Sequence, residues 1–218
     1  MSGNPGPIPS GSRVIVYIDG FNLYYGVLKF SRDKWLDIAR YFELLRPHDS
    51  IQRIRYFTAL SSDGKSQDQL TYLKALETRP MVNTILGRYK KKSVKCLVQT
   101  CSVIQKDRIF KSHEEKRTDV NIAVSMLDDA YQNLCDHLIV VSGDSDLVPA
   151  VNMVKSRFPS KEVTVYVPSR SPVRGAAVEL RAAADKHRDL PLNLLKIAQL
   201  PASVPDGSGG FIVKPATW

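Results

Sequence analysis

The sequence predicts an α/β fold built around a mainly parallel, doubly wound sheet. Short runs rich in β-branched residues alternate along the chain with segments whose apolar residues recur at helical spacing. Several of these runs are apolar at successive positions, which is typical of strands that helices cover on both faces. Strands that alternate with helices pair in parallel through right-handed crossovers. The length of 218 residues suits one domain of this class.

The alternation defines strands and helices in chain order. The expected strands cover residues 14–19, 51–60, 82–86, 137–141 and 163–167. The expected helices cover residues 22–28, 35–45, 66–77, 119–133, 147–157 and 174–186. Because most of the helices stand between two strands, we expect helical layers on both faces of the sheet.

Three segments fall outside this alternation. Residues 88–116 carry the densest positive charge in the chain, and we predict a β-hairpin over residues 94–110. Residues 1–12 and 201–218 are rich in Gly, Pro and Ser and have no apolar period, so we expect flexible tails there. A single folded domain is therefore expected over residues 13–200.

The charge balance points to a polyanionic partner. Lys and Arg number 31 against 22 Asp and Glu, which leaves a net charge of +9 with His neutral. This excess favours nucleic acid ahead of anionic lipid. No apolar stretch reaches the roughly 18–20 residues of a membrane helix and the first residues do not resemble a signal peptide, so we expect no membrane association and a cytoplasmic location. Three cysteines, an odd number, argue against a disulfide framework.

Acidic residues follow two of the expected strands. Asp19 ends the first strand, and Asn22 stands at the start of the next helix. The strand over residues 137–141 runs into a turn that contains two hydroxyls and two acids: Ser142, Ser145, Asp144 and Asp146. Ligands of open α/β sheets bind outside the carboxyl ends of the strands, so these side chains are candidates for a site.

A third acidic contribution comes from the helix expected over residues 119–133. Asp119 shares the face of its apolar stripe, so the carboxylate is expected to point inward from the first turn. The helix dipole favours negative charge in that turn. Asp128 and Asp129 fall on the outer side or the edge of this helix and are expected to be surface charges.

Four carboxylates at one sheet edge require a neutralising charge. Asp19, Asp119, Asp144 and Asp146 would repel one another, and neither strand-end motif contains Lys or Arg. A hard divalent cation with oxygen ligands, Mg²⁺ or Mn²⁺, is the simplest neutraliser, and such an ion activates water against phosphoryl groups. Each acid taken alone is an ordinary turn or cap residue, and only their coincidence favours a site.

Three motifs resemble a known family in order and in spacing. IDGFN at 18–22, EKRTDVNIAVSM at 115–126 and VVSGDSDLVPAV at 140–151 resemble the NYN domains of the PIN-like nuclease superfamily, especially the LabA-like bacterial branch. The similarity covers about residues 13–190. It implies a three-layer PIN-like Rossmannoid sandwich and a Mg²⁺- or Mn²⁺-dependent ribonuclease acting on RNA phosphodiester bonds.

The resemblance also implies roles for single residues. Asp19 and Asp144 would ligate the metal, and Asp119 and Asp146 would complete the acidic set directly or through water. Asn22 would orient a water or the substrate phosphate. Ser142 or Ser145 would assist in the same way. The family commonly has Gly-Val before the helix Asp, where this chain has Arg117 and Thr118, and Phe is frequent at the position of Leu147.

Basic and aromatic residues supply candidate RNA contacts. The expected substrate-binding cations are Lys90, Lys91, Lys92, Lys116 and Arg117, although such a run also suits a solvated face. Tyr24 and Tyr25 follow IDGFN, where one of them could stack on a base and at least one is expected to pack under the first helix.

Other readings of the sequence stay open. Cys96, Cys101 and His113 suggest zinc only weakly, because no second cysteine pair follows. The same fold could serve as an RNA-binding or regulatory module with an idle pocket, or as a phosphatase acting on a small phosphoester. A homo-oligomer is possible.

Overall fold

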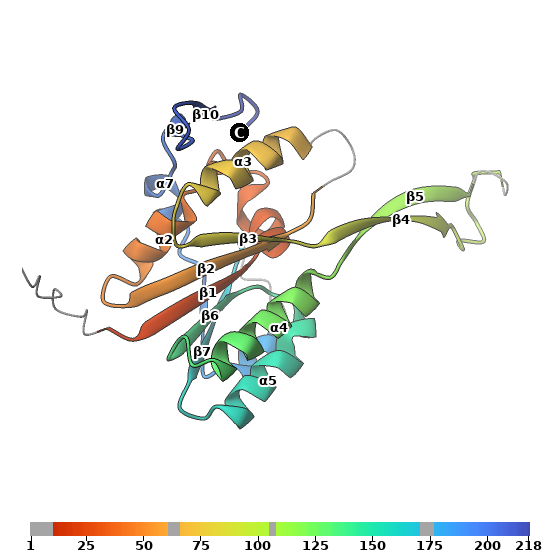
Figure 1. Ribbon diagram of the computed structural model, residues 1–218. Helices are drawn as coiled ribbons and strands as arrows, with labels where there is room; N and C mark the ends of the chain where they lie inside the picture. The colour runs from red at the N-terminus through yellow and green to blue at the C-terminus, as the bar shows by residue number, and fades with distance from the viewer. Residues whose placement is uncertain (1–10, 61–65, 105–107, 171–176) are drawn as a thin grey trace, which may run out of the picture.

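The protein is built on a six-stranded parallel sheet. The computed structural model describes residues 11–60, 66–104, 108–170 and 177–218. The strands follow the order β3-β2-β1-β6-β7-β8, and every neighbouring pair is parallel (Figure 1). Their bounds are Arg13–Asp19 (β1), Ser50–Thr58 (β2), Val82–Leu86 (β3), His137–Val141 (β6), Glu162–Val167 (β7) and Lys186–Asp189 (β8). The predicted fold class is confirmed.

Helices cover both faces of the sheet and complete a three-layer sandwich (Figure 1). One layer contains α1 (Gly20–Leu23), the π-helix η1 (Tyr24–Leu28), α2 (Ile38–Leu45), α3 (Ser66–Glu77) and α7 (Asn193–Ile197). The other layer contains α4 (Thr118–Tyr131), the 3₁₀-helix η3 (Ser145–Leu147), α5 (Val148–Arg157) and α6 (Val178–Ala183). Over the described residues, no helix combines the length and apolar character that crossing a membrane requires.

The central strand β1 explains why two hydrophobic cores form. Val14, Val16 and Ile18 pack into the core under α1, α2 and α3, whereas Ile15 and Tyr17 pack into the core under α4 and α5. Successive side chains of a strand point to opposite faces, so an uninterrupted apolar run supplies both cores. The same run therefore places β1 in the middle of the sheet.

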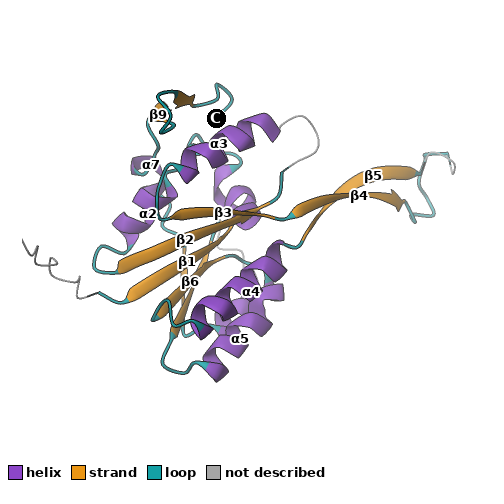
Figure 2. Cartoon of the chain, in the orientation of Figure 1, coloured by secondary structure: helices purple, strands orange, loops and turns teal. Residues whose placement is uncertain are grey.

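A β-hairpin of β4 (Arg88–Lys95) and β5 (Ile109–Lys116) projects from the sheet edge beyond β3 as a separate arm (Figure 2). The two strands are antiparallel, with Tyr89 opposite Glu115 and Lys91 opposite His113. The hairpin predicted over residues 94–110 is confirmed in kind, but its strands begin earlier and end later than that interval and overlap it by only two residues at each end. The prediction missed most of both strands, because the charged residues of β4 do not alternate with apolar ones as in a half-buried strand.

The C-terminal segment differs from the prediction of a flexible tail. Strands β9 (Ser203–Pro205) and β10 (Phe211–Val213) form a short antiparallel hairpin, and Trp218 lies against Trp35 and Tyr72 with ring centroids 6.3 and 4.9 Å apart. Strands of three residues leave no apolar period in the sequence, so docking on the core decides their structure. The tail expected at the other end lies, over residues 1–10, outside the described residues.

Two further differences concern helices. The predicted helix over residues 22–28 is divided into α1 and the π-helix η1, and π-turns are frequent at functional sites. The helix expected over residues 174–186 ends earlier than predicted, because α6 ends at Ala183 and the chain then enters β8, while residues 174–176 lie outside the described residues. All four residues of β8 are exposed, so it carries no apolar signal.

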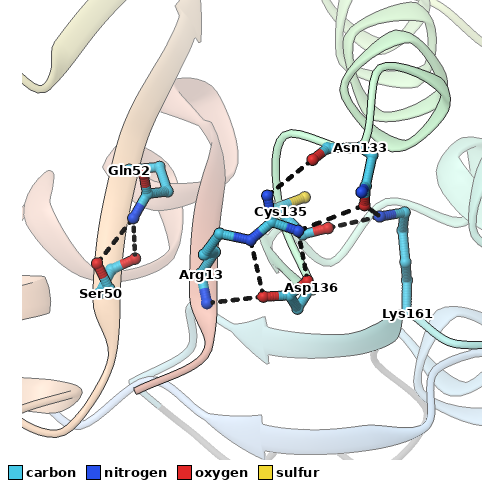
Figure 3. Close-up of polar contacts among 7 residues, drawn as sticks. All are labelled: Arg13, Ser50, Gln52, Asn133, Cys135, Asp136 and Lys161. Carbon is cyan, nitrogen blue, oxygen red and sulfur yellow. Dashed lines mark hydrogen bonds and ion pairs between the residues drawn. The ribbon is translucent and has the colours of Figure 1, made fainter. Parts of the chain in front are cut away.

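At the amino ends of the strands, polar contacts tie β1, β6 and β7 together (Figure 3). The Arg13 guanidinium donates to the Asp136 carboxylate at 2.6 and 3.0 Å, and the buried Lys161 ammonium donates to the Cys135 carbonyl at 2.6 Å. Lys161 also donates to the Asn133 side chain at 2.7 Å. Burial raises the pKa of the Cys135 thiol to about 11, so this cysteine is an unreactive core residue.

Candidate metal centre

The candidate site lies where the order of strands in the sheet reverses. From β1 the chain proceeds to β2 on one side, and from β6 it proceeds to β7 on the other, so the β1–β6 pair is the topological switch point. Ile18 pairs with Val141 at the carboxyl end of this pair. The next residues, Asp19 and Ser142, therefore lie side by side at the crevice where open α/β sheets bind ligands.

Asp19 organises the two loops that leave these strands. One carboxylate oxygen accepts hydrogen bonds from the backbone N–H groups of Phe21 and Asn22, both at 3.0 Å, and so caps α1. The other accepts from Asn22 Nδ2 at 2.6 Å and from Ser142 Oγ at 3.0 Å. Burial raises the pKa of this carboxyl group, and these hydrogen bonds oppose the shift.

Asn22 and Ser142 connect Asp19 to the second acidic loop. Asn22 Oδ1 accepts a hydrogen bond from the backbone N–H of Gly143 at 3.0 Å. Ser142 Oγ accepts from the backbone N–H of Asp144 at 3.1 Å, and the Asp144 carboxylate accepts from the N–H of Asp146 at 3.0 Å. Ser142 is fully buried, which favours a positioning role over contact with a substrate, whereas Ser145 is exposed beside the acids.

Three carboxylates converge in front of these loops. Each of Asp119, Asp144 and Asp146 offers an oxygen atom, and these oxygens all lie within 4.8 Å of one another. Asp119 comes from the first turn of α4, as its place on the apolar face predicts, and the other two come from the turn after β6. Asp19 lies behind this group and is not one of the three.

The charge of this cluster is not balanced by the described side chains. Over the described ranges, none of Asp119, Asp144 and Asp146 forms an ion pair with Lys, Arg or His. Burial and the neighbouring charges of Asp144, Asp19 and Asp146 raise the pKa of Asp119 to about 6. Three close carboxylates without a protein cation are a donor set that suits a hard divalent ion.

Glu115 is a member of the acidic cluster that the sequence analysis missed. It is the last residue but one of β5. Burial, together with the charges of Asp19, Asp119 and Asp144, raises its pKa to about 8. Thr118 Oγ1 donates a hydrogen bond to its carboxylate. The glutamate lies within the motif EKRTD, but only the register of the hairpin shows that its side chain turns toward the acids.

The base of the hairpin is held against the start of α4. A Cβ atom on Gly87 would lie 2.7 Å from Thr118 Oγ1 and 2.8 Å from the Lys116 carbonyl, so only glycine permits this approach. Arg117 turns the chain into α4 with φ at 83°, in the left-handed region that favours glycine. This conformation explains why glycine suits the position in the family that the motifs resemble.

The basic residues divide between two faces of the hairpin. Tyr89 and Glu115 are cross-strand partners that both turn toward the site, and the alternation of side chains puts Lys91 on this same face. We call it the site face. Lys90, Lys92 and Lys116 lie on the opposite face around Glu114, which Lys116 approaches to 2.7 Å and Lys92 to 3.9 Å. Arg117 is exposed at the base of the arm.

Asp129 is not the surface charge that was expected. It is fully buried, and the Arg55 guanidinium from β2 donates to it at 2.5 and 2.8 Å. Tyr17 Oη donates to the same carboxylate at 2.8 Å. The prediction failed because Asp129 lies at the edge of the apolar stripe of α4, where β2 covers it. Asp128 is exposed as expected.

An aromatic cavity of about 590 Å³ adjoins the acidic cluster. Gly20 and Phe21, the two residues after Asp19, form part of its wall. The aromatic rings that line it are Phe21, Tyr24, Tyr25, Tyr56, Tyr72, Tyr89 and Trp218. Among the described residues, the candidate metal-binding group does not include the cysteines that suggested zinc.

Comparisons with known proteins agree with this architecture. The model of the NYN domain family matches residues 13–192. A curated relative, 6-hydroxy-3-succinoylpyridine 3-monooxygenase HspA of Pseudomonas putida, is 28% identical over 94% of this chain and 75% of its own length. The crystal structure of a protein of unknown function from Vibrio parahaemolyticus has a TM-score of 0.51 and 19% identity, and the match covers 85% of this chain and 96% of that one. The chain described here belongs to the NYN domain family.

Proposed function

We propose that this protein is a metal-dependent ribonuclease that hydrolyses phosphodiester bonds of RNA. The observation that carries the proposal is the group of three carboxylates at the switch point, whose charge no described basic side chain balances. Membership of the NYN family and the net charge of +9 support a nuclease acting on a polyanion. RNA is proposed over DNA on the strength of the family resemblance.

The side chains have separate roles in this proposal. Asp119, Asp144 and Asp146 would hold Mg²⁺ or Mn²⁺, with Asp19 as the buried member of the acidic set. The bound ion supplies charge stabilisation at a phosphoryl oxygen and activation of water. Asn22 and Ser142 keep the two loops in register, because each joins the turn after β1 to the turn after β6. Ser145, exposed beside the acids, is proposed as a contact for the substrate phosphate.

Binding of a cation at this centre is expected to be coupled to the release of protons from the acids. Glu115 holds a proton at neutral pH when no cation is bound, since its pKa is about 8. A cation among the acids would lower the pKa of Glu115 and of Asp119 by direct attraction. Binding of the ion is therefore expected to release protons.

The hairpin is proposed to hold the RNA backbone. Its site face leads outward from Tyr89 and Glu115 to Lys91, so a phosphate of a strand leaving the acidic cluster would meet Lys91 first. Lys90, Lys92 and Lys116 belong to the opposite face, and Arg117 lies at the base. These cations would contribute to the general attraction of RNA.

The test is cleavage of a mixed single-stranded RNA pool with Mn²⁺ by the wild type, Asp144→Asn and Asp19→Asn. We expect both substitutions to lower the rate by about 10²-fold or more while RNA affinity changes little. Asp128→Asn is the matched control, because Asp128 is an exposed acid on α4 outside the cluster. Cleavage that survives in both cluster variants, or that disappears equally in the control, would contradict the proposal.

A second candidate is an RNA-binding module with an idle pocket. The observation that favours it is the set of four hydrogen bonds on Asp19, which gives this one acid a structural use without an ion. This candidate predicts salt-sensitive RNA binding and no turnover with any divalent metal. The cleavage assay separates the two functions.

A third candidate is chemistry on a small aromatic ring. The name of the Pseudomonas putida relative describes it as a monooxygenase of 6-hydroxy-3-succinoylpyridine, and the aromatic cavity of this chain could hold such a ring. Consumption of that pyridine with supplied dioxygen and a nicotinamide reductant would support this candidate. No consumption, together with Mn²⁺-dependent RNA cleavage, would remove it.

A further inference from the structure

The aromatic cavity has a buried floor and an open rim. Tyr56 and Tyr72 are 6% and 2% exposed and form the floor, whereas Tyr25 is 57% exposed at the rim. Thr58 and Gln69 are the polar residues of the wall, where the Gln69 amide donates to Thr58 Oγ1 and to the Ala59 carbonyl, both at 3.1 Å. A cavity with aromatic faces and a few polar groups suits a flat heterocycle with hydrogen-bonding edges.

The rings at the rim are arranged for stacking. Phe21 and Tyr25 are nearly parallel, with an angle of 17° between their planes and centroids 6.2 Å apart. Tyr89 meets Phe21 edge to face at 5.6 Å. The Lys29 ammonium lies 4.8 Å from the centre of the Tyr25 ring. A cation beside an aromatic face is a combination that binds a base together with its phosphate.

The cavity lies next to the acidic cluster at two places, although none of the acids of that cluster lines it. The first is the chain itself, because Gly20 and Phe21 directly follow Asp19, and the Asp19 charge raises the pKa of Tyr56 in the floor after the larger effect of burial. The second is the base of the hairpin, where Tyr89 lines the cavity and its cross-strand partner Glu115 belongs to the cluster. Because the two places are neighbours, we expect one strand of RNA to reach both.

We propose that this cavity binds an unstacked nucleobase of single-stranded RNA next to the phosphodiester at the acidic cluster. Tyr25 supplies the stacking face when the Lys29 ammonium, which lies over its ring, turns to the flanking phosphate, and Lys34 attracts the same phosphate. The position of that phosphodiester rests on the proposed function, whereas the binding of the base rests on the cavity. Paired RNA is excluded from this mode, since its bases are already stacked.

The test compares two tetranucleotide ligands of equal charge. One is a fluorescently labelled single-stranded RNA, and the other has the same ribose-phosphate backbone without bases. Binding to the full chain is followed by fluorescence anisotropy in EDTA, so no cleavage takes place. The wild type is expected to bind the base-bearing ligand about fivefold or more tightly than the abasic one.

Three variants test whether the preference for the base-bearing ligand depends on Tyr25. Tyr25→Ala should abolish the difference between the two ligands, and Tyr25→Phe, which keeps the ring, should preserve it. Phe30→Ala is the matched control, because Phe30 is 86% exposed close to Lys29 but does not line the cavity. Circular dichroism establishes that each variant keeps the wild-type fold.

Three results would overturn the inference. The first is equal affinity of the wild type for the two ligands. The second is an equal loss of the base preference in Phe30→Ala and Tyr25→Ala, and the third is displacement of the labelled RNA by a free hydroxypyridine carboxylate but not by unlabelled RNA. The outcome is independent of turnover. A protein that prefers the base-bearing ligand but does not cleave RNA would support the base-binding cavity and contradict the proposed nuclease. Cleavage without a preference for the base-bearing ligand would support the nuclease and contradict the base-binding cavity.

Discussion

At the scale of single residues, buried charge is used in two ways in this protein. Asp129 is fully buried but paired, because Arg55 and Tyr17 both donate to it. Asp119 and Glu115 are partly buried and unpaired by any described cation, and their pKa values rise to about 6 and about 8. The paired acid stabilises the fold, whereas the unpaired acids retain a capacity to bind a cation.

Removal of the Asp129 carboxylate should destabilise the protein strongly. Asp129→Ala leaves the Arg55 guanidinium, 14% exposed, without its buried partner, so the free energy of unfolding is expected to fall by about 3–5 kcal/mol. Chemical denaturation measures the change. Asp128→Ala is the neighbouring control and is expected to stay within about 0.5 kcal/mol of the wild type. Equal effects of the two substitutions would contradict the assignment of Asp129 to the core.

The unpaired acids predict how stability changes with pH. The pKa of Glu115 is higher in the folded state than in the unfolded state, so the folded protein holds a proton that unfolding releases. Without divalent ions, stability is therefore expected to fall as the pH rises toward about 8 and to level off above it. One proton limits this slope to about 1.4 kcal/mol per pH unit.

The measurement is a melting series from about pH 6.5 to about pH 8.5 in EDTA and in Mn²⁺. The lowered pKa of buried His137 affects stability below this range, since its unfolded value is 6.5. Glu115→Gln should remove most of the slope in EDTA and leave the smaller contribution of Asp119 at the acid end, since the pKa of Asp119 is about 6. Mn²⁺ should raise the melting temperature more at the alkaline end of the series, because fewer protons compete there with the ion for the carboxylates. A wild-type series already flat in EDTA would show that Glu115 does not hold the proton.

At the scale of elements, the hairpin decides which basic residues can serve the site. Strand alternation separates Lys91 on the site face from Lys90 on the opposite face, although the two are adjacent in the sequence. The Lys116 ammonium donates to Glu114 at 2.7 Å and lowers the pKa of that carboxyl group, so part of the charge on the opposite face is neutralised within the arm.

This separation predicts unequal effects of two neighbouring substitutions. Lys91→Ala is expected to weaken RNA binding and to reduce the salt slope of log affinity by about 1, as for one lost phosphate contact. Lys90→Ala should change the slope by less, because its side chain points away from the site. A salt series by fluorescence anisotropy measures both. Equal losses would mean that RNA is attracted by the whole arm and not by one face.

At the scale of the whole molecule, the buried strands and their layers followed from the sequence, because β1, β6 and β7 carry apolar runs that only a doubly covered sheet accommodates. The convergence of Asp119, Asp144 and Asp146 followed from strand ends and a helix face. β8 could not be predicted in this way, since its residues are all exposed.

The failures share a physical cause, which is dependence on contacts between distant parts of the chain. Glu115 joins the acids only through the register of the hairpin, and Asp129 is covered only because β2 carries Arg55 beside it. The C-terminal hairpin packs on the core through Val204 and Ile212, and Trp218 beyond it contacts Trp35 and Tyr72. Local periodicity contains none of this information.

One cross-strand pair of the hairpin links the aromatic cavity to the acids. Tyr89 and Glu115 sit opposite each other on β4 and β5, and one serves the aromatic cavity while the other serves the acids. Gly87 and Arg117 are the residues at which the two strands join the body of the protein. Because the ring and the carboxylate share one cross-strand pair, a substitution that shifts the base of the hairpin is expected to displace both of them together.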